Sequence, residues 1–294
     1  MGVVAVSQDQ LLSLEGSVEE ERSPAPSAGS NEVAEFLRDC PLVFGLDDEG
    51  LEQVASLCTI VTFHAREQVF AEGEVDSGLW ILMSGRVRLY HSDPEGRQLV
   101  VGFPAPHTPL DLAALDGRPH TVGATALERC RVLLVPQAAR VVIARRFPET
   151  IVNTMRQLSR DLRQRDISHA VLSFRSARGR ICCTLVQLAE QYGIHQYKRV
   201  KINFRLTRQD LADRSGVTLE TSIRVLSDLQ RRGVVATRSK VIEILDQAEL
   251  EEWSGCSECE LDCTVFAKPT AADMPQVARP VSAGAPRRLV TSLR

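Results

Sequence analysis

One segment of the chain constrains the fold more than any other, because it predicts two short helices joined by a tight turn. Thr207 and Asp210 are three residues apart, as the two partners of a capping box are at the start of a helix. Gly216 permits the turn, and Thr218 is placed to cap the next helix. Such a pair of helices is typical of a helix-turn-helix, whose second helix enters the major groove of DNA.

The residues after this pair predict a β-hairpin, and the local charge favours a nucleic-acid partner. Gly233 ends the second helix, and the apolar runs 234–237 and 241–244 are spaced as the strands of a wing. The net charge of the chain is −3, but residues 156–240 hold 18 Lys and Arg against 7 Asp and Glu. A basic stretch can also be a solvated helix face, so the charge supports the motif without replacing it.

Short apolar runs separated by turns occupy the first half of the chain. The expected strands are residues 60–63, 68–70, 79–82, 87–90, 99–102 and 131–135. Turn pairs such as Ser84-Gly85 and Asp116-Gly117 separate them. Regular spacing of short strands and turns predicts a sandwich or a barrel.

After residue 148 the hydrophobic period changes to that of a long helix. Its apolar positions recur at spacings of three and four and form a heptad seam at Ile151, Met155, Leu158 and Leu162. A helix packed on its own domain would show similar spacing, but a narrow seam over a long helix favours a second copy as partner.

These patterns together predict an α+β fold. The expected parts are a disordered N-terminal extension (1–30), a sensor β-barrel (31–147), a dimerisation helix (148–175), a winged helix-turn-helix (176–247), a cysteine-containing tail (248–268) and a disordered C-terminus (269–294). Asn31 is expected to cap a short helix over residues 32–38. Because no apolar run can span a membrane and no signal peptide is evident, we expect a cytoplasmic protein.

Three segments, taken in order, resemble the CRP/FNR family of bacterial regulators from about Phe36 to Leu245. They are Glu72-Gly73-Glu74 with Leu79–Tyr90, Ala124–Leu133, and Leu206–Ala212 with Glu220–Leu226. They are similar to the family's barrel hairpin, the segment that closes its barrel, and its helix-turn-helix. The resemblance implies a cyclic-nucleotide-binding-like barrel (a double-stranded β-helix), a dimerisation helix and a winged helix-turn-helix. It also implies a homodimer that binds palindromic double-stranded DNA and contacts RNA polymerase.

The exposed start of the second helix is expected to read bases through Leu219, Glu220, Ile223 and Arg224. Glu220 can accept a hydrogen bond from cytosine, and Arg224 can donate two to guanine. A surface ion pair between them is the alternative. Leu219 resembles the FNR type more than the cyclic-AMP type, and Ile223 replaces a smaller residue. The expected phosphate contacts are Thr207, Arg208, Gln209, Thr218, Thr221, Arg232 and Lys240.

The sensor site departs from the family's nucleotide-binding pattern. Leu110 stands where the family has Gly, Asp111 where it has Glu, and His120, before Thr121, where it has Arg. A neutral histidine is a poor substitute for a guanidinium that binds phosphate. We therefore expect Asp111, His120 and Thr121 to form a degenerate pocket, with a cyclic nucleotide or another small molecule as the alternative effector.

Three of the eight cysteines, Cys256, Cys259 and Cys263, are closely spaced, as in iron–sulfur and zinc sites. The cluster is similar to the C-terminal three-cysteine motif of family members that carry a 4Fe-4S cluster completed by a carboxylate. The candidates for the fourth ligand are Asp161, Asp166 and Asp262, or alternatively Cys182 or Cys183. The last two also fit the role of small buried hydrophobes. Zinc, or metal-free tail thiols, are the alternatives for the cluster.

Two other classes of protein compete with a transcription regulator. A barrel of this kind can serve as the small-molecule-binding subunit of an enzyme, but the helix-turn-helix pattern argues against that role. The sequence has no Gly-rich phosphate loop, nucleophile elbow or suitably placed pair of carboxylates, so we do not expect an enzyme. We expect a regulator whose effector is redox state, oxygen or nitric oxide rather than cyclic AMP.

Overall fold

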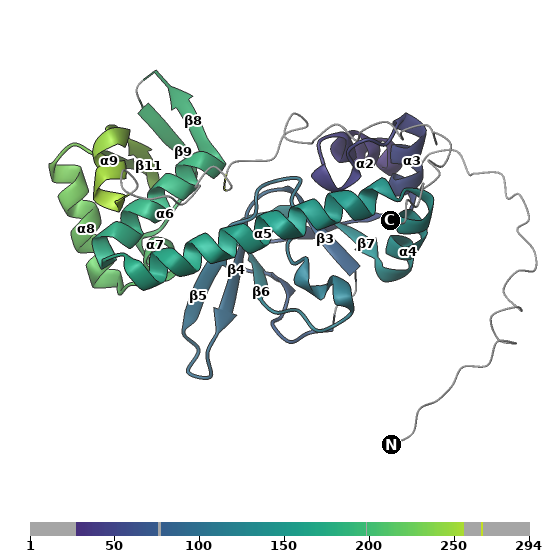
Figure 1. Cartoon of the computed structure of the whole chain (residues 1–294), viewed down its shortest axis with the longest axis horizontal. Helices are drawn as coiled ribbons and strands as arrows, with labels where there is room; N and C mark the ends of the chain where they lie inside the picture. The colour runs from purple at the N-terminus through teal and green to yellow at the C-terminus, as the bar shows by residue number, and fades with distance from the viewer. Residues whose placement is uncertain (1–27, 76–77, 198, 256–265, 267–294) are drawn as a thin grey trace, which may run out of the picture.

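One long helix joins two groups of secondary structure in the computed structural model, which describes residues 28–75, 78–197, 199–255 and 266 (Figure 1). The N-terminal elements are α2 (Ala28–Arg38), η1 (Pro41–Val43), α3 (Asp48–Ser56), β1 (Thr59–Phe63), β2 (Gln68–Phe70), β3 (Gly78–Ser84), β4 (Val87–Ser92), β5 (Gln98–Gly102), η2 (Ala113–Asp116), β6 (Gly123–Ala126), β7 (Cys130–Pro136) and α4 (Gln137–Arg146). The long helix is α5 (Glu149–Phe174). The C-terminal elements are α6 (Ala177–Tyr192), β8 (Gly193–Gln196), β9 (Arg199–Arg205), α7 (Arg208–Ser215), α8 (Leu219–Arg231), β10 (Val235–Arg238), β11 (Val241–Ile244) and α9 (Gln247–Ser254).

The sensor domain is built on two antiparallel sheets with strand orders β1-β7-β3 and β2-β6-β4-β5. Phe70 and Ala124 of one sheet pack with Leu82 and Val132 of the other in a shared apolar core. The six expected strands are present, and the α+β architecture is confirmed. The two sheets stay separate where a closed barrel was expected.

Helix α2 begins earlier than the local signal indicated. The predicted helix starts after Asn31, but residues 28–30 already form its first turn, so the expected disorder is wrong for these three residues. Val33 and Leu37 are buried in a core cluster with α3. Because this buried face stabilises the helix as a whole, its start is not set by the side chain of Asn31.

The C-terminal domain combines helices with a four-stranded sheet of order β10-β11-β9-β8. The wing β10–β11 was predicted from the sequence, but β8 and β9 were not. The signal for β9 was present, since Val200, Ile202 and Phe204 are buried and alternate with exposed neighbours. Such a period of two is typical of a half-buried strand.

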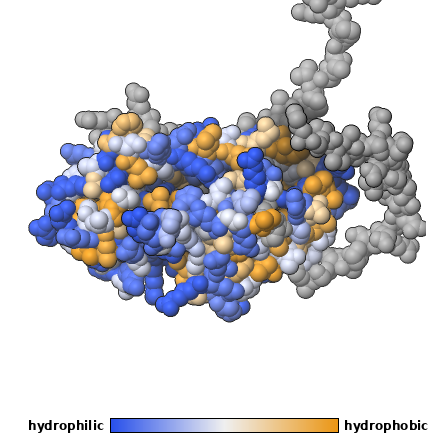
Figure 2. Space-filling view, turned by 90° about the horizontal axis from the view of Figure 1, so that it is seen from below, coloured by the Kyte–Doolittle hydropathy of each residue, from blue (hydrophilic) through white to orange (hydrophobic). Residues whose placement is uncertain are grey.

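The surface of the described part is mixed in character. On the face shown in Figure 2, apolar areas are separated by hydrophilic side chains. Among the described residues, no helix is both long enough and apolar enough to cross a membrane.

Candidate nucleic-acid interface

Local hydrogen bonds place α7 and α8 as the sequence predicted. The backbone N–H of Asp210 donates to Thr207 Oγ1 at 3.0 Å, and the Asp210 carboxylate accepts from the Thr207 N–H at 3.0 Å, which completes the capping box. Gly216 ends α7 with a φ of +59°, where a side chain would be strained. The N–H of Thr221 then donates to Thr218 Oγ1 at 3.2 Å and caps α8.

One face of α8 is buried and the other is free to meet a ligand. Ser222, Val225, Leu226 and Leu229 face the domain core. The four predicted base-reading residues, Leu219, Glu220, Ile223 and Arg224, are all exposed at the beginning of the helix. No ion pair joins Glu220 to Arg224 in the part of the chain that the structure describes, so neither charge is neutralised by the other.

A hollow of about 210 Å³ beside the start of α7 brings together three of the predicted phosphate contacts, Thr207, Arg208 and Lys240. Ser239 and Lys240 have φ angles of 51° and 66°, which place Lys240 in the tight turn of the wing. A cation on each side of a hollow at a helix N-terminus is suited to a phosphate group.

Two other predicted phosphate contacts are engaged within the protein. Gln209 donates from its amide to Asp213. The Arg232 guanidinium lies 4.6 Å from the centre of the Trp253 ring and 3.7 Å from Asp228. Arg178 covers Trp253 at the same distance of 4.6 Å. Arg178 of α6 and Arg232 at the end of α8 therefore both hold α9 in place, an arrangement that the sequence did not predict.

The degenerate sensor pocket is closed on itself. His120 Nδ1 lies 3.1 Å from Asp111 Oδ2, and the two side chains are only 2% and 1% exposed. The N–H of Thr121 donates to the same carboxylate at 3.2 Å, and the His120 ring stacks on Phe70 with centroids 3.8 Å apart. Asp111, His120 and Thr121 are thus engaged with one another inside the sensor domain.

The three clustered cysteines and Asp262 lie outside the described residues. Within the described residues, no group of three or more His, Cys, Asp or Glu side chains is placed to hold a metal ion. The residues that flank the cluster do have defined places. Cys183 Sγ donates to the carbonyl of Ser254 at 3.5 Å, and Phe266 packs with Ile167, Val171 and Cys183.

The candidate fourth ligands occupy different surroundings. Cys182 and Cys183 are buried on α6, as small hydrophobes would be. Asp166 is exposed on α5. Burial raises the pKa of Asp161, which accepts a hydrogen bond from Gln157 at 2.9 Å, and the charge of Asp111 in the sensor domain adds to this rise. Of the described candidates, Cys183 is the one that contacts residues flanking the cysteine cluster.

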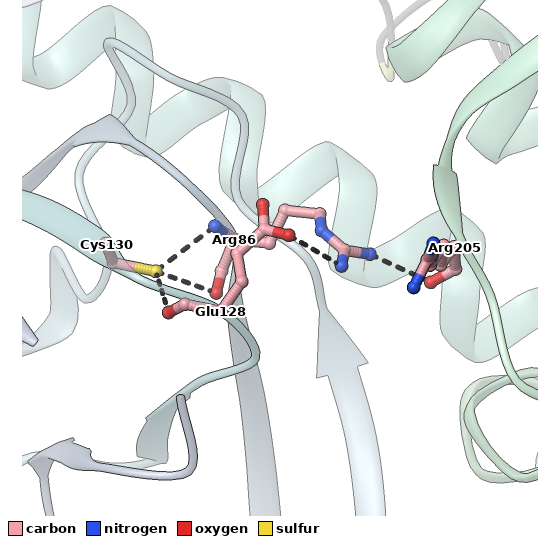
Figure 3. A network of polar contacts seen from close by, with 4 residues as sticks. All are labelled: Arg86, Glu128, Cys130 and Arg205. Atoms are coloured by element: carbon pink, nitrogen blue, oxygen red, sulfur yellow. Dashed lines mark hydrogen bonds and ion pairs between the residues drawn. The ribbon is translucent and has the colours of Figure 1, made fainter. Parts of the chain in front are cut away.

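A polar bridge connects the sensor domain to the DNA-binding domain (Figure 3). Arg86 donates to the Glu128 carboxylate at 2.9 Å and to the backbone carbonyl of Arg205 on β9 at 2.8 Å. Cys130 Sγ donates to the Arg86 carbonyl at 3.0 Å, which fixes the backbone of the bridging arginine. Arg86 also lies over Phe204, 5.5 Å from the ring centre.

The predicted dimer seam is uncovered in the single chain. Along α5, Ile151, Met155, Leu158 and Leu162 are 47%, 60%, 39% and 61% exposed. Four large apolar side chains on one stripe of a helix are suited to pairing with another helix.

Comparison with known proteins agrees with both halves of this architecture. Residues 60–144 match the model of the cyclic nucleotide-binding domain, and residues 179–253 match the Crp-like helix-turn-helix domain. A CRP-like cAMP-activated global transcriptional regulator of Mycobacterium tuberculosis is 29% identical over 74% of this chain and 97% of its own length. The transcriptional activator protein Anr of Pseudomonas protegens is 26% identical over 65% of this chain and 78% of its own length.

Solved structures agree with the fold. A CRP-family transcriptional regulator from Thermus thermophilus superimposes with a TM-score of 0.57 and 26% identity, over 69% of this chain and 99% of that protein. FixK2 from Bradyrhizobium japonicum has a TM-score of 0.60 and 21% identity, over 67% of this chain and 96% of its own. With both domains matched in order along the chain, the protein belongs to the CRP/FNR family and is a DNA-binding transcription regulator of that family.

Proposed function

We propose that the protein binds a palindromic DNA site as a homodimer and reads bases with the start of α8. The observation that carries this proposal is that Glu220 and Arg224 are both exposed on α8 and form no ion pair with each other. The opposite face of α8 is buried. An arginine can recognise guanine by two hydrogen bonds, and a carboxylate can accept from cytosine. Thr207, Arg208 and Lys240, which line one hollow nearby, would hold the DNA backbone in register.

Dimerisation through α5 is the second part of the proposal. A two-fold partner would cover the apolar stripe that begins at Ile151 and ends at Leu162. A two-fold dimer presents two recognition helices, and its half-sites are expected to lie about one helical turn of DNA apart. RNA polymerase is the further partner that we propose.

The proposed effector is a change in redox state, oxygen or nitric oxide, detected by a 4Fe-4S cluster. Thiolates are the donors that such a cluster requires, and Cys256, Cys259 and Cys263 would supply three of them. The cluster would supply an oxidant-sensitive group to the segment that follows α9. Cys183 donates to Ser254 of α9, and Trp253 of α9 lies against Arg232 at the end of α8, so a change in the tail can alter how the recognition helix is held. An effector shifts the population only if it favours one of the two states.

DNA binding is tested with fluorescence anisotropy on a palindromic duplex selected from a random pool. Arg224→Ala is expected to lose the preference for the selected sequence over a scrambled one. Arg208→Ala is expected to weaken binding to both duplexes alike, because a phosphate contact carries no sequence information. Failure of the wild-type protein to select any duplex would favour a small-molecule-binding role for the sensor domain.

The effector is tested on protein purified without oxygen. We expect a broad visible absorption that bleaches in air and is absent in Cys259→Ser. Comparison of the variants Cys182→Ser, Cys183→Ser, Asp161→Asn, Asp166→Asn and Asp262→Asn identifies the fourth ligand by loss of that absorption. A colourless protein that contains zinc or no metal, or whose DNA affinity changes with a cyclic nucleotide, would refute the redox proposal.

A further inference from the structure

Two arginines from different helices converge on a small cavity at the joint between α5 and the DNA-binding domain. The cavity measures about 20 Å³ and is lined by Arg180 of α6, Arg214 of α7 and part of α5 around Ser168. Leu172 of α5 closes one side, and a Cβ placed on Gly216 would lie only 3.0 Å from it. Three helices therefore pack closely around two cationic groups.

Among the described residues, no carboxylate lies within ion-pair distance of Arg180 or Arg214. Arg180 makes one long contact to the Leu172 carbonyl at 3.5 Å, and its buried Nε has no hydrogen-bond partner. Burial lowers the pKa of Arg214 to about 10, so this cation is poorly solvated. Both arginines are half-buried, and a charge that is partly removed from water is costly without a counter-charge.

Apart from Val171 and Leu172, the remaining lining side chains are neutral hydrogen-bonding groups. Thr184 and Gln187 are each 5% exposed, and Ser215 is 1% exposed. The Ser215 hydroxyl donates to Thr184 Oγ1 at 2.9 Å. No hydrogen bond is made by the Gln187 side chain within the described residues. Hydroxyl and amide groups can donate to an anion, but they cannot neutralise two arginines.

We propose that this cavity binds a small inorganic anion between Arg180 and Arg214. The anion would be chloride, or nitrate with one of its oxygens in the cavity. A volume of about 20 Å³ admits a single water-sized atom, which matches a halide or one oxygen of a small oxyanion. The anion would accept hydrogen bonds from the two guanidiniums and from the neighbouring polar groups. Because the site joins α5, α6 and α7, its occupancy would stabilise the position of the helix-turn-helix on the dimerisation helix.

The test measures thermal unfolding of the full chain without DNA, in gluconate, chloride or nitrate at constant ionic strength. A bound anion raises Tm with a saturable dependence on its concentration, by about 3–6 °C at ten times its Kd. This rise is expected for chloride or nitrate with wild-type protein and with Arg145→Gln, a variant of an exposed arginine on α4. Arg180→Gln and Arg214→Gln are expected to remove it.

Crystals soaked in bromide give a direct readout that does not depend on how the variants fold. An anomalous peak between Arg180 and Arg214 is expected, and the same peak is expected to be missing in Arg180→Gln. A wild-type shift that never saturates, an equal shift in Arg180→Gln, or no peak in the cavity would overturn the proposal. Since neither measurement involves DNA, failure of the proposed DNA site would leave the result interpretable.

Discussion

Leu162→Ala is expected to weaken self-association of the protein roughly 30- to 140-fold. Leu162 lies on the apolar stripe of α5 and is 61% exposed in the single chain. In the proposed dimer this surface faces the same helix of a second copy. The substitution removes apolar area at the seam and leaves an alanine, which is a good helix former, so α5 itself should persist.

The magnitude follows from the exposed area. Complete burial of a leucine side chain is worth about 2–3 kcal/mol, and the dimer would bury roughly the remaining 60% of it. After allowance for the Cβ that alanine keeps, the loss is about 1 kcal/mol or slightly more per chain. Two-fold symmetry doubles it to about 2–3 kcal/mol per dimer, which sets the expected change in Kd.

Sedimentation equilibrium without DNA measures the monomer–dimer Kd. The matched control is Leu57→Ala, which removes a leucine that is 37% exposed at the end of α3. The control is expected to leave the Kd unchanged. Equal weakening by both variants, or a Kd within about threefold of wild type for Leu162→Ala, would refute the assignment of this stripe as the dimer seam.

Three further results are expected. Arg224→Ala should cost about 1–3 kcal/mol of discrimination between the selected and a scrambled duplex, measured by anisotropy. Arg86→Ala should remove about 2 kcal/mol of coupling between the domains, because it deletes the charged hydrogen bond to the Arg205 carbonyl and the contact with the Phe204 ring, and calorimetry should then resolve two transitions. Wild type is expected to lose more free energy of unfolding between pH 4 and pH 7 than Asp161→Asn does. Burial raises the pKa of this carboxyl, so the wild-type folded state binds the proton more tightly and loses stability as pH rises through that pKa.

Each of these expectations has an outcome that contradicts it. Equal loss of affinity for both duplexes would make Arg224 a backbone contact. A single unchanged transition in Arg86→Ala would show that apolar packing around Phe103 and Phe204 alone holds the domains together. Urea unfolding that gives wild type and Asp161→Asn the same pH dependence would show that Asp161 is not the buried acid of α5.

The local features of the DNA-binding domain were predictable from sequence because each depends on residues no more than four positions apart. The capping box of Thr207 and Asp210, the turn at Gly216 and the exposed face around Glu220 and Arg224 all belong to this class. The stripe of α5 was predictable for a related reason, since a helical period recurs along the chain whatever the helix packs against. The alternation of buried and exposed residues in β9 is a local signal of the same kind.

Only the tertiary structure decided which distant residues meet. Arg86 and Arg205 are 119 positions apart, and no periodicity indicates that one donates to the carbonyl of the other. The closure of the sensor pocket by Asp111 and His120 likewise depends on how a loop folds back. The pairing of Arg180 with Arg214 around one cavity arises from three helices packing together. Such contacts follow from the relative placement of whole elements, which the pattern within each element does not contain.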